Sequence, residues 1–261
     1  SKGTNAKNIL ISKLTARNVH SCIVVNRGGN RKAENWLLND INIQAYYRVA
    51  IRFSGNDTRK LTMQYLSLDG ANSSGENHCY KGGIQLYQGA NDIIISNAVI
   101  VNNVGNCGNS YQQGDGIEAD HKGGKTRNIF INNVRVGNSG DANIDLKASG
   151  VIMSNVNSFT LNKSRYAYKL WGYSDYNCEN CSAEGSFSAF INLNSAVAEF
   201  NNFRFSGSNA TKLVRCRKWP GKMLPKLKLH NGSVLSMHKE IYNTFKKCAF
   251  EIDSVVTETH N

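Results

Sequence analysis

Proline is almost absent from this sequence, and so is any helical pattern. Only two of the 261 residues are proline, and no segment carries apolar residues at the period of about 3.6 residues that marks an amphipathic helix. Because proline cannot donate a backbone hydrogen bond, its scarcity suits a chain in which nearly every N–H enters a β-ladder. The sequence also lacks any proline-rich linker, charge run or low-complexity tract that would mark a domain boundary. These absences point to one long all-β unit.

Targeting signals are missing as well. The chain begins at Ser1 in the middle of a strand pattern, without an initiator methionine, a signal peptide or a transmembrane run. We interpret this as a trimmed chain, so the missing signal says little about location.

Cysteine is present, but no zinc-binding arrangement accompanies it. The pair Cys178 and Cys181 has no second CxxC and no His pair to complete a site, so packing or a disulfide explains it better than metal binding. Seven cysteines leave at least one unpaired within the chain. The pairs Cys79–Cys107 and Cys216–Cys248 are possible bridges, and the redox compartment stays open.

A short strand signal returns roughly every 22–33 residues, a period typical of solenoids. Because alternate residues of a strand face opposite sides, a buried column of central residues places its neighbours toward solvent. The expected buried column is Ile23, Ile51, Ile84, Ile117, Ile144, Tyr168 and Ile191. The expected outer positions are Arg52, Gln85, Glu118, Asp145, Lys169 and Asn192, followed two residues later by Ser54, Tyr87, Asp120, Lys147, Trp171 and Asn194.

A second strand pattern, bounded by asparagine, lies between the copies of the first. Asn8, Asp92 and Asn128 each open such a segment. Asparagine tolerates left-handed backbone at sharp bends, and its amide can bond to an asparagine of the next coil. We therefore predict an all-β, right-handed parallel β-helix of about seven to nine coils over residues 1–211. Residues 212–261 should form final irregular coils or a C-terminal cap of the same domain. A β-sandwich or a propeller is the alternative, although propeller blades need longer repeats and hairpin turns.

The net charge of +12 restricts the partners. A basic surface suits nucleic acid, an anionic membrane or an acidic polysaccharide. The sequence shows no nucleic-acid-binding motif or dense basic run, and no amphipathic helix for a membrane surface. We expect an acidic polysaccharide, and neither nucleic acid nor membrane. The alternative is a generally basic protein without such a partner, and the sequence leaves the oligomeric state open.

Acidic residues concentrate on two neighbouring coils. Asp115 and Glu118 belong to one expected coil, and Asp141 and Asp145 to the next. Neighbouring coils of a parallel solenoid lie about 4.8 Å apart, so these carboxylates should converge. Like charges at that spacing repel unless a cation neutralises them, and hard oxygen ligands suit Ca²⁺. The alternative is a solvated polar ladder balanced by nearby lysines.

Lys169 lies one coil beyond Asp145 in the same outer column and is the candidate general base. A bound cation and the flanking Arg165 would disfavour its charged form and so lower its pKa. Lys147, two residues after Asp145 on the same face, is the rival candidate. As an alternative, Lys169 only forms a salt bridge with Asp145.

The remaining candidate residues would contact the substrate. Tyr87 and Trp171 can stack on sugar faces, although an exposed aromatic ring on a β-helix also serves ordinary packing. Polar groups of the same region complete the expected substrate-binding set, namely Glu118, His121 and Arg52.

Three successive segments carry a specific resemblance. They read Asp115-Gly116-Ile117, then Asn138-Ser139-Gly140-Asp141-Ala142-Asn143-Ile144-Asp145-Leu146, then Ala167-Tyr168-Lys169-Leu170. This region, about a third of the chain, resembles the core of the calcium-dependent pectate lyases of polysaccharide lyase family 9. The resemblance implies that Asp115, Asp141 and Asp145 hold Ca²⁺ and that Lys169 abstracts the C5 proton of a sugar. Ala142 replaces one of the paired acids of the family. The Asn-Thr-Asp and Gly-His-Gly motifs of polygalacturonases are absent.

The expected function is β-elimination of an acidic polysaccharide, with Arg165, His121 or Lys147 stabilising or protonating the product. A uronan C5-epimerase would form the same carbanion. An inverting hydrolase could use Glu118 and Asp145 as its two carboxylates, although their expected spacing is nearer that of retaining enzymes. A non-catalytic glycan-binding β-helix, such as an adhesin or a phage spike, is the fourth alternative. The substrate class implies a secreted, cell-surface or periplasmic protein.

Overall fold

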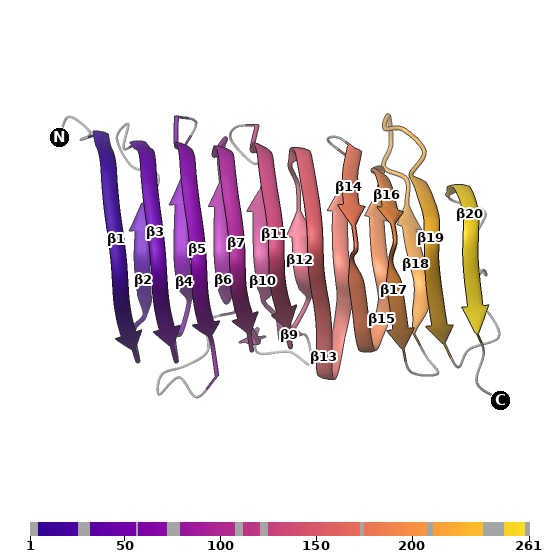
Figure 1. Cartoon of the computed structure of the whole chain (residues 1–261), viewed down its shortest axis with the longest axis horizontal. Coiled ribbons are helices and arrows are strands. Elements are labelled where there is room, and N and C mark those ends of the chain that lie inside the picture. Colours follow the sequence, from indigo (N-terminus) through magenta and orange to yellow (C-terminus); the bar gives the residue numbers. More distant parts are fainter. Residues whose placement is uncertain are drawn as a thin grey trace.

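The protein is a parallel β-solenoid of about eight turns, as its computed structural model shows (Figure 1). The structure describes residues 5–25, 32–55, 57–71, 79–107, 112–120, 125–172, 175–207, 211–236 and 248–258. Among these residues there is no helix, and hence none that could cross a membrane. All pairings in the main sheet are parallel.

Long and short strands alternate along the first part of the chain. The long strands are β1 (Asn5–Arg17), β3 (Lys32–Gln44), β5 (Arg59–Asp69), β7 (Asn91–Val101) and β11 (Arg127–Gly137). The short strands are β2 (Ser21–Val25), β4 (Val49–Ser54), β6 (Gly82–Tyr87), β10 (Asp115–Asp120) and β12 (Ala142–Leu146). In Figure 1 the long strands descend in front and the short strands rise behind, while the chain advances from the N-terminal end. This path is right-handed, as predicted.

The later strands continue both faces. They are β13 (Ser149–Trp171), β14 (Asp175–Glu179), β15 (Ser182–Asn194), β16 (Val197–Asn201), β17 (Arg204–Gly207), β18 (Lys212–Arg217), β19 (Lys226–Ser236) and β20 (Ala249–Glu258). A separate antiparallel pair joins β8 (Gly105–Asn106) to β9 (Gln112–Gln113). We call β1, β3, β5, β7, β11, the start of β13 and β14 the long-strand face. The short strands and the end of β13 form the short-strand face.

The predicted interior column is confirmed. Its residues are register partners from one coil to the next and are all buried, namely Ile23, Ile51, Ile84, Ile117, Ile144, Tyr168 and Ile191. Each coil therefore adds one side chain to a continuous apolar core, which no coil could bury alone.

Asparagine forms bends at the corners of several coils, as predicted. Asn8, Asn35 and Asn128 have left-handed backbone with φ of 55°, 58° and 54°. Asn35 Nδ2 donates to Asn8 Oδ1 of the preceding coil at 2.7 Å. A second corner repeats this contact between Asn133 Nδ2 and Asn97 Oδ1, again at 2.7 Å. Corner amides thus fix the register of neighbouring coils, because each forms a hydrogen bond only when the coils are aligned.

The described part of residues 212–261 continues the stack. β18 pairs in register with β15, and β19 with β16, β17 and β20. The described strands of this segment therefore stack on the same solenoid. Pro220 and Pro225 interrupt no ladder, because both lie in the connection between β18 and β19.

The structure forms three disulfides. They join the two expected pairs, Cys79–Cys107 and Cys216–Cys248, and also Cys178 with Cys181. Cys22 is the free cysteine. The CxxC pair is thus a disulfide rather than half of a metal site.

Replacing Ile117 by alanine should destabilise the protein by about 2–5 kcal/mol, because the side chain is fully buried between two coils. Urea unfolding followed by circular dichroism measures this change. Leu10→Ala is the matched control, since Leu10 is 64% exposed and its loss should change stability by less than about 0.5 kcal/mol. Equal effects of the two changes would contradict the assignment of Ile117 to the core.

Candidate functional site

Three aspartates converge on the short-strand face. Asp115 begins β10, Asp141 immediately precedes β12, and Asp145 lies within β12. All three are buried, and one carboxylate oxygen of each lies within 4.8 Å of the others. The coil register brings them together: Asp115 pairs with Ala142, the residue after Asp141, and Glu118 pairs with Asp145. The predicted convergence is confirmed for these three aspartates, which we call the acid triad, while Glu118 is not part of the cluster.

Two cationic side chains neutralise part of the acid triad. Lys169 Nζ lies 2.6 Å from Asp141 Oδ2 and 2.7 Å from Asp145 Oδ2. Arg165 Nη1 donates to Asp141 Oδ1 at 2.9 Å. Asp115 has no ion pair among the described residues and accepts a hydrogen bond from the Ala142 N–H at 3.0 Å. Three carboxylates therefore meet two cations, and one negative charge remains in excess when all are ionised.

An indole ring orients Asp145. Trp171 Nε1 donates to Asp145 Oδ1 at 2.6 Å, and Lys169 Nζ lies 5.4 Å from the centre of the Trp171 ring. Lys147 Nζ lies over the same ring at 5.1 Å. Trp219 meets Trp171 edge to face, with 5.4 Å between ring centroids. Both candidate bases thus border one aromatic surface next to the acid triad.

Trp219 was missed from the sequence. It is 41% exposed and follows β18, whose residue Arg217 is aligned with Trp171 through Asn194. Extending the outer column by one coil past Asn194 would have pointed to this region.

Glu118 anchors a chain of hydrogen bonds toward the N-terminal coils. Its Oε2 accepts from the Tyr87 hydroxyl at 2.6 Å and from Gln85 Nε2 at 3.0 Å. Arg52 Nε in turn donates to Gln85 Oε1 at 2.9 Å. The expected substrate-binding residues Arg52, Tyr87 and Glu118 therefore form one connected polar strip. His121 lies outside the described residues.

Burial raises the pKa of two acids at the site. The pKa of Asp115 is well above its usual range, because the group is buried and faces the charges of Asp145, Glu118 and Asp141. Burial and the Asp145 charge also raise the pKa of Glu118, by more than the Tyr87 hydrogen bond lowers it. Ionising these carboxylates is costly, and a bound cation would offset this cost.

The pKa of Lys169 differs from the sequence-based expectation. Burial alone would lower it, but the charges of Asp145, Asp141 and Asp115 raise it overall. Arg165 does not reverse this effect, because its guanidinium faces Asp141. The pKa of Lys147 is raised too, since Asp145, Asp120 and Glu118 outweigh its burial. Lys169 is therefore an ammonium ion in the arrangement described.

The acid triad fits a hard divalent cation by its chemistry. It offers three carboxylates and no sulfur or imidazole ligand. When all three are ionised, they carry one more negative charge than Lys169 and Arg165 neutralise. Asp115, Asp141 and Asp145 would hold the ion. The ammonium of Lys169 contacts two of the same three carboxylates, so it competes with a cation for their charge.

Asp115→Asn should stabilise the protein at pH 7 in the presence of a chelator. Because the folded-state pKa of Asp115 is raised, ionisation costs stability as pH rises above the unfolded value of about 3.9. The amide of the Asp115→Asn variant cannot ionise and so avoids this cost. Its gain in stability over the unchanged protein should therefore become smaller as the pH falls toward 4. Thermal unfolding at both pH values measures it, with the exposed Glu184→Gln as control. A loss of stability at pH 7 would contradict the raised pKa.

Comparison with protein-family models and with curated proteins finds no match to this chain.

Proposed function

We propose that this protein is a polysaccharide lyase that cleaves a uronic-acid-containing polysaccharide by β-elimination. The observation that carries the proposal is the position of Lys169 Nζ, within hydrogen-bonding distance of two buried carboxylates of a triad suited to a divalent cation. A lyase needs these two elements together, a site that binds a carboxylate through a cation and a base that takes the neighbouring proton. The resemblance to the family 9 pectate lyases agrees with this pairing.

Lys169 is the proposed base. It would remove the C5 proton of the uronate, and the electron pair would then expel the C4 oxygen to leave an unsaturated sugar. When bound, Ca²⁺ supplies charge that neutralises the substrate carboxylate and acidifies the C5 proton. Lys169 can accept a proton only when Asp141 and Asp145 no longer stabilise its charged form, because their charges raise its pKa.

The surrounding residues have positioning roles in this proposal. Arg165 fixes one oxygen of Asp141, and Trp171 fixes one oxygen of Asp145. The Arg165 side chain is 38% exposed, so it can also reach a substrate carboxylate or the departing oxygen. Lys147 borders the same surface and could return a proton to that oxygen. The polar strip of Arg52, Tyr87 and Glu118 would extend the contact along the polymer.

The partner and the location belong to the same proposal. The net charge of +12 favours an acidic polymer through long-range attraction. Three disulfides suit an oxidising compartment, and therefore a secreted, cell-surface or periplasmic protein.

Incubation with a panel of uronic-acid polymers tests the function. Polygalacturonate, alginate and a glucuronan, each with Ca²⁺ or with a chelator, should yield the ultraviolet absorbance of unsaturated ends for at least one polymer with Ca²⁺. New reducing ends without that absorbance would favour a hydrolase that uses Glu118 and Asp145. Exchange of solvent deuterium into intact polymer would favour a C5-epimerase.

The second candidate is a non-catalytic glycan-binding β-helix. The ammonium state of Lys169 favours it, because a lysine bonded to two aspartates also serves as a purely structural ion pair. In that case the panel yields no product, and Lys169→Ala leaves polymer binding unchanged.

A further inference from the structure

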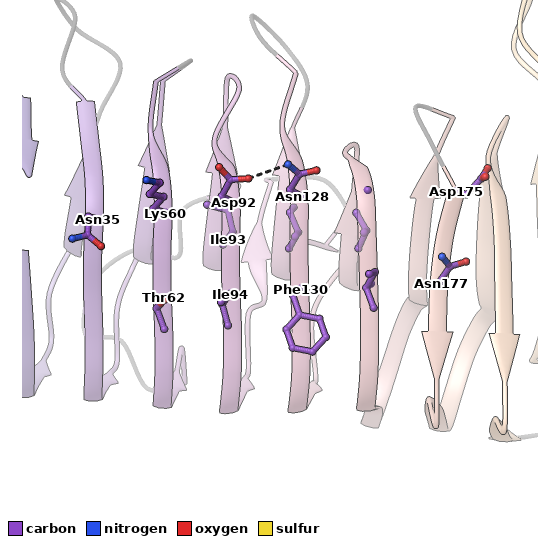
Figure 2. A pocket seen from close by; sticks show the side chains of 14 residues that line it. Asn35, Lys60, Thr62, Asp92, Ile93, Ile94, Asn128, Phe130, Asp175 and Asn177 are labelled. Atoms are coloured by element: carbon purple, nitrogen blue, oxygen red, sulfur yellow. Dashed lines mark hydrogen bonds between the residues drawn. The ribbon is translucent and has the colours of Figure 1, made fainter. Parts of the chain in front are cut away.

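A groove lies on the long-strand face, away from the acid triad (Figure 2). Its volume of about 740 Å³ is within the range of small-molecule binding sites, and 14 residues line it. The lining residues come from β3, β5, β7, β11, β13 and β14, which are successive strands of the stack. Five spacings of about 4.8 Å give the groove a length of roughly 24 Å along the solenoid.

The floor of the groove is apolar and open to solvent. Ile94, Phe130 and Ile152 are register partners and are 42%, 39% and 52% exposed. Each is the middle residue of an apolar triplet whose outer members are buried, as in Ile129-Phe130-Ile131. Because side chains alternate along a strand, the middle residue of each triplet points outward. It is not part of the core, so core packing does not explain why it is apolar. Such a contiguous apolar patch on a soluble surface marks an interaction site.

Hydrogen-bonding side chains border the floor. Asn128 Nδ2 donates to Asp92 Oδ1 at 2.9 Å, and Figure 2 shows this pair at one edge of the groove with Asn35 and Lys60 on the neighbouring strands. Asn35, Asp92 and Asn128 have left-handed backbone, so the corners of successive coils hold their side chains in line. The occupant therefore meets an apolar surface and a row of amide and carboxylate groups together.

The structure argues against a protein as the occupant. The backbone groups of β7, β11 and β13 are already used in the ladder between coils, so an added peptide strand finds no edge to pair with. Fourteen lining residues are fewer than the roughly 20–30 per partner of a stable protein interface. A second copy would also bring together two chains that each carry a charge of +12.

We propose that this groove binds a neutral carbohydrate chain along the solenoid axis. A sugar ring has an apolar face of C–H groups, which fits Phe130 and the isoleucines, and a rim of hydroxyls, which fits the amides and Asp92. The rim carries charges of both signs, Lys60 against Asp92 and Asp175, so it offers no cationic attraction for a polyuronate. The inference is independent of the proposed lyase activity, because the groove and the acid triad lie on different faces.

Affinity electrophoresis tests the inference with the full chain. Gels containing soluble xylan, galactan or glucomannan should retard the protein in at least one case. Phe130→Ala should weaken this retardation about tenfold, since it removes the one aromatic surface of the floor. Leu10→Ala is the matched control, because Leu10 belongs to the same outward column but lies beyond the groove. Lys169→Arg should leave the retardation unchanged, which separates this site from the proposed lyase site.

Two results would overturn the proposal. The first is no retardation in any of the three gels, or retardation that Phe130→Ala does not change. The second is self-association in analytical ultracentrifugation that Phe130→Ala abolishes, which would assign the groove to a second copy of the chain. Phe130 is on the surface, and circular dichroism will show that the variant keeps its fold.

Discussion

A Lys169→Arg protein is expected to lose nearly all turnover, about 10²–10⁴-fold, while it keeps its affinity for the polymer. Arginine preserves the positive charge and can bond to Asp141 and Asp145, but its pKa is too high for it to serve as a base. The absorbance of unsaturated ends measures turnover, and affinity electrophoresis in a uronic-acid polymer measures binding. Loss of turnover without loss of polymer binding identifies Lys169 as the group that takes the proton.

Lys147→Arg is the matched comparison. Lys147 borders the same Trp171 ring and also faces Asp145, so charge and position are similar. If Lys169→Arg stays active and Lys147→Arg does not, the base is Lys147. If neither change matters in a protein that releases unsaturated product, the proton is taken by another group and our assignment fails.

Asp145→Ala should abolish Ca²⁺ binding to the chelator-treated protein. Asp145 supplies one of the three converging carboxylates. Without it, the charges of Asp115 and Asp141 are balanced by those of Arg165 and Lys169, both of which contact Asp141, and no negative charge remains in excess. Isothermal calorimetry should show heat of binding for the unchanged protein and none for the variant. Asp145→Asn keeps the shape of the side chain and its hydrogen bond with Trp171 but removes the charge. It should also fail to bind Ca²⁺, which would show that the loss is not caused by misfolding.

The competition between Lys169 and a bound cation can be tested by measuring the affinity for Ca²⁺. Because the ammonium bonds to Asp141 and Asp145, Lys169→Ala should bind Ca²⁺ more tightly than the unchanged protein. Absence of heat in both proteins, with activity unaffected by chelator, would favour a salt-bridged ladder without metal.

The sequence was sufficient for the fold because its signals are local and repeated. The column of Ile51, Ile84 and Ile117 recurs with each coil, and asparagines such as Asn35 mark the corners, so each copy supports the others. The convergence of Asp115, Asp141 and Asp145 followed from the same register. The stacking of β18 and β19 was harder to foresee, because basic residues and a connection with both prolines obscure the repeat there.

Features that depend on the direction of a single side chain were not predicted from the sequence. The pKa of Lys169 depends on which neighbouring groups its ammonium contacts. The position of Lys169 in the outer column does not reveal that the guanidinium of Arg165 faces Asp141 and not Lys169. The groove on the long-strand face could have been found, since Ile93-Ile94-Ile95 breaks the alternation expected of a half-solvated strand. Its signal was overlooked because apolar triplets also occur in strands buried on both faces.

The stacking of coils has a consequence for how such a protein can change in length. Each strand pairs only with the coil before it and the coil after it, as β5 does with β3 and β7. Insertion of one complete coil between β3 and β5 would therefore displace the N-terminal end by about 4.8 Å and leave the distances within the acid triad unaltered. By duplication or loss of whole coils, evolution can lengthen or shorten the surface proposed to bind a polymer without changing the arrangement of the acid triad.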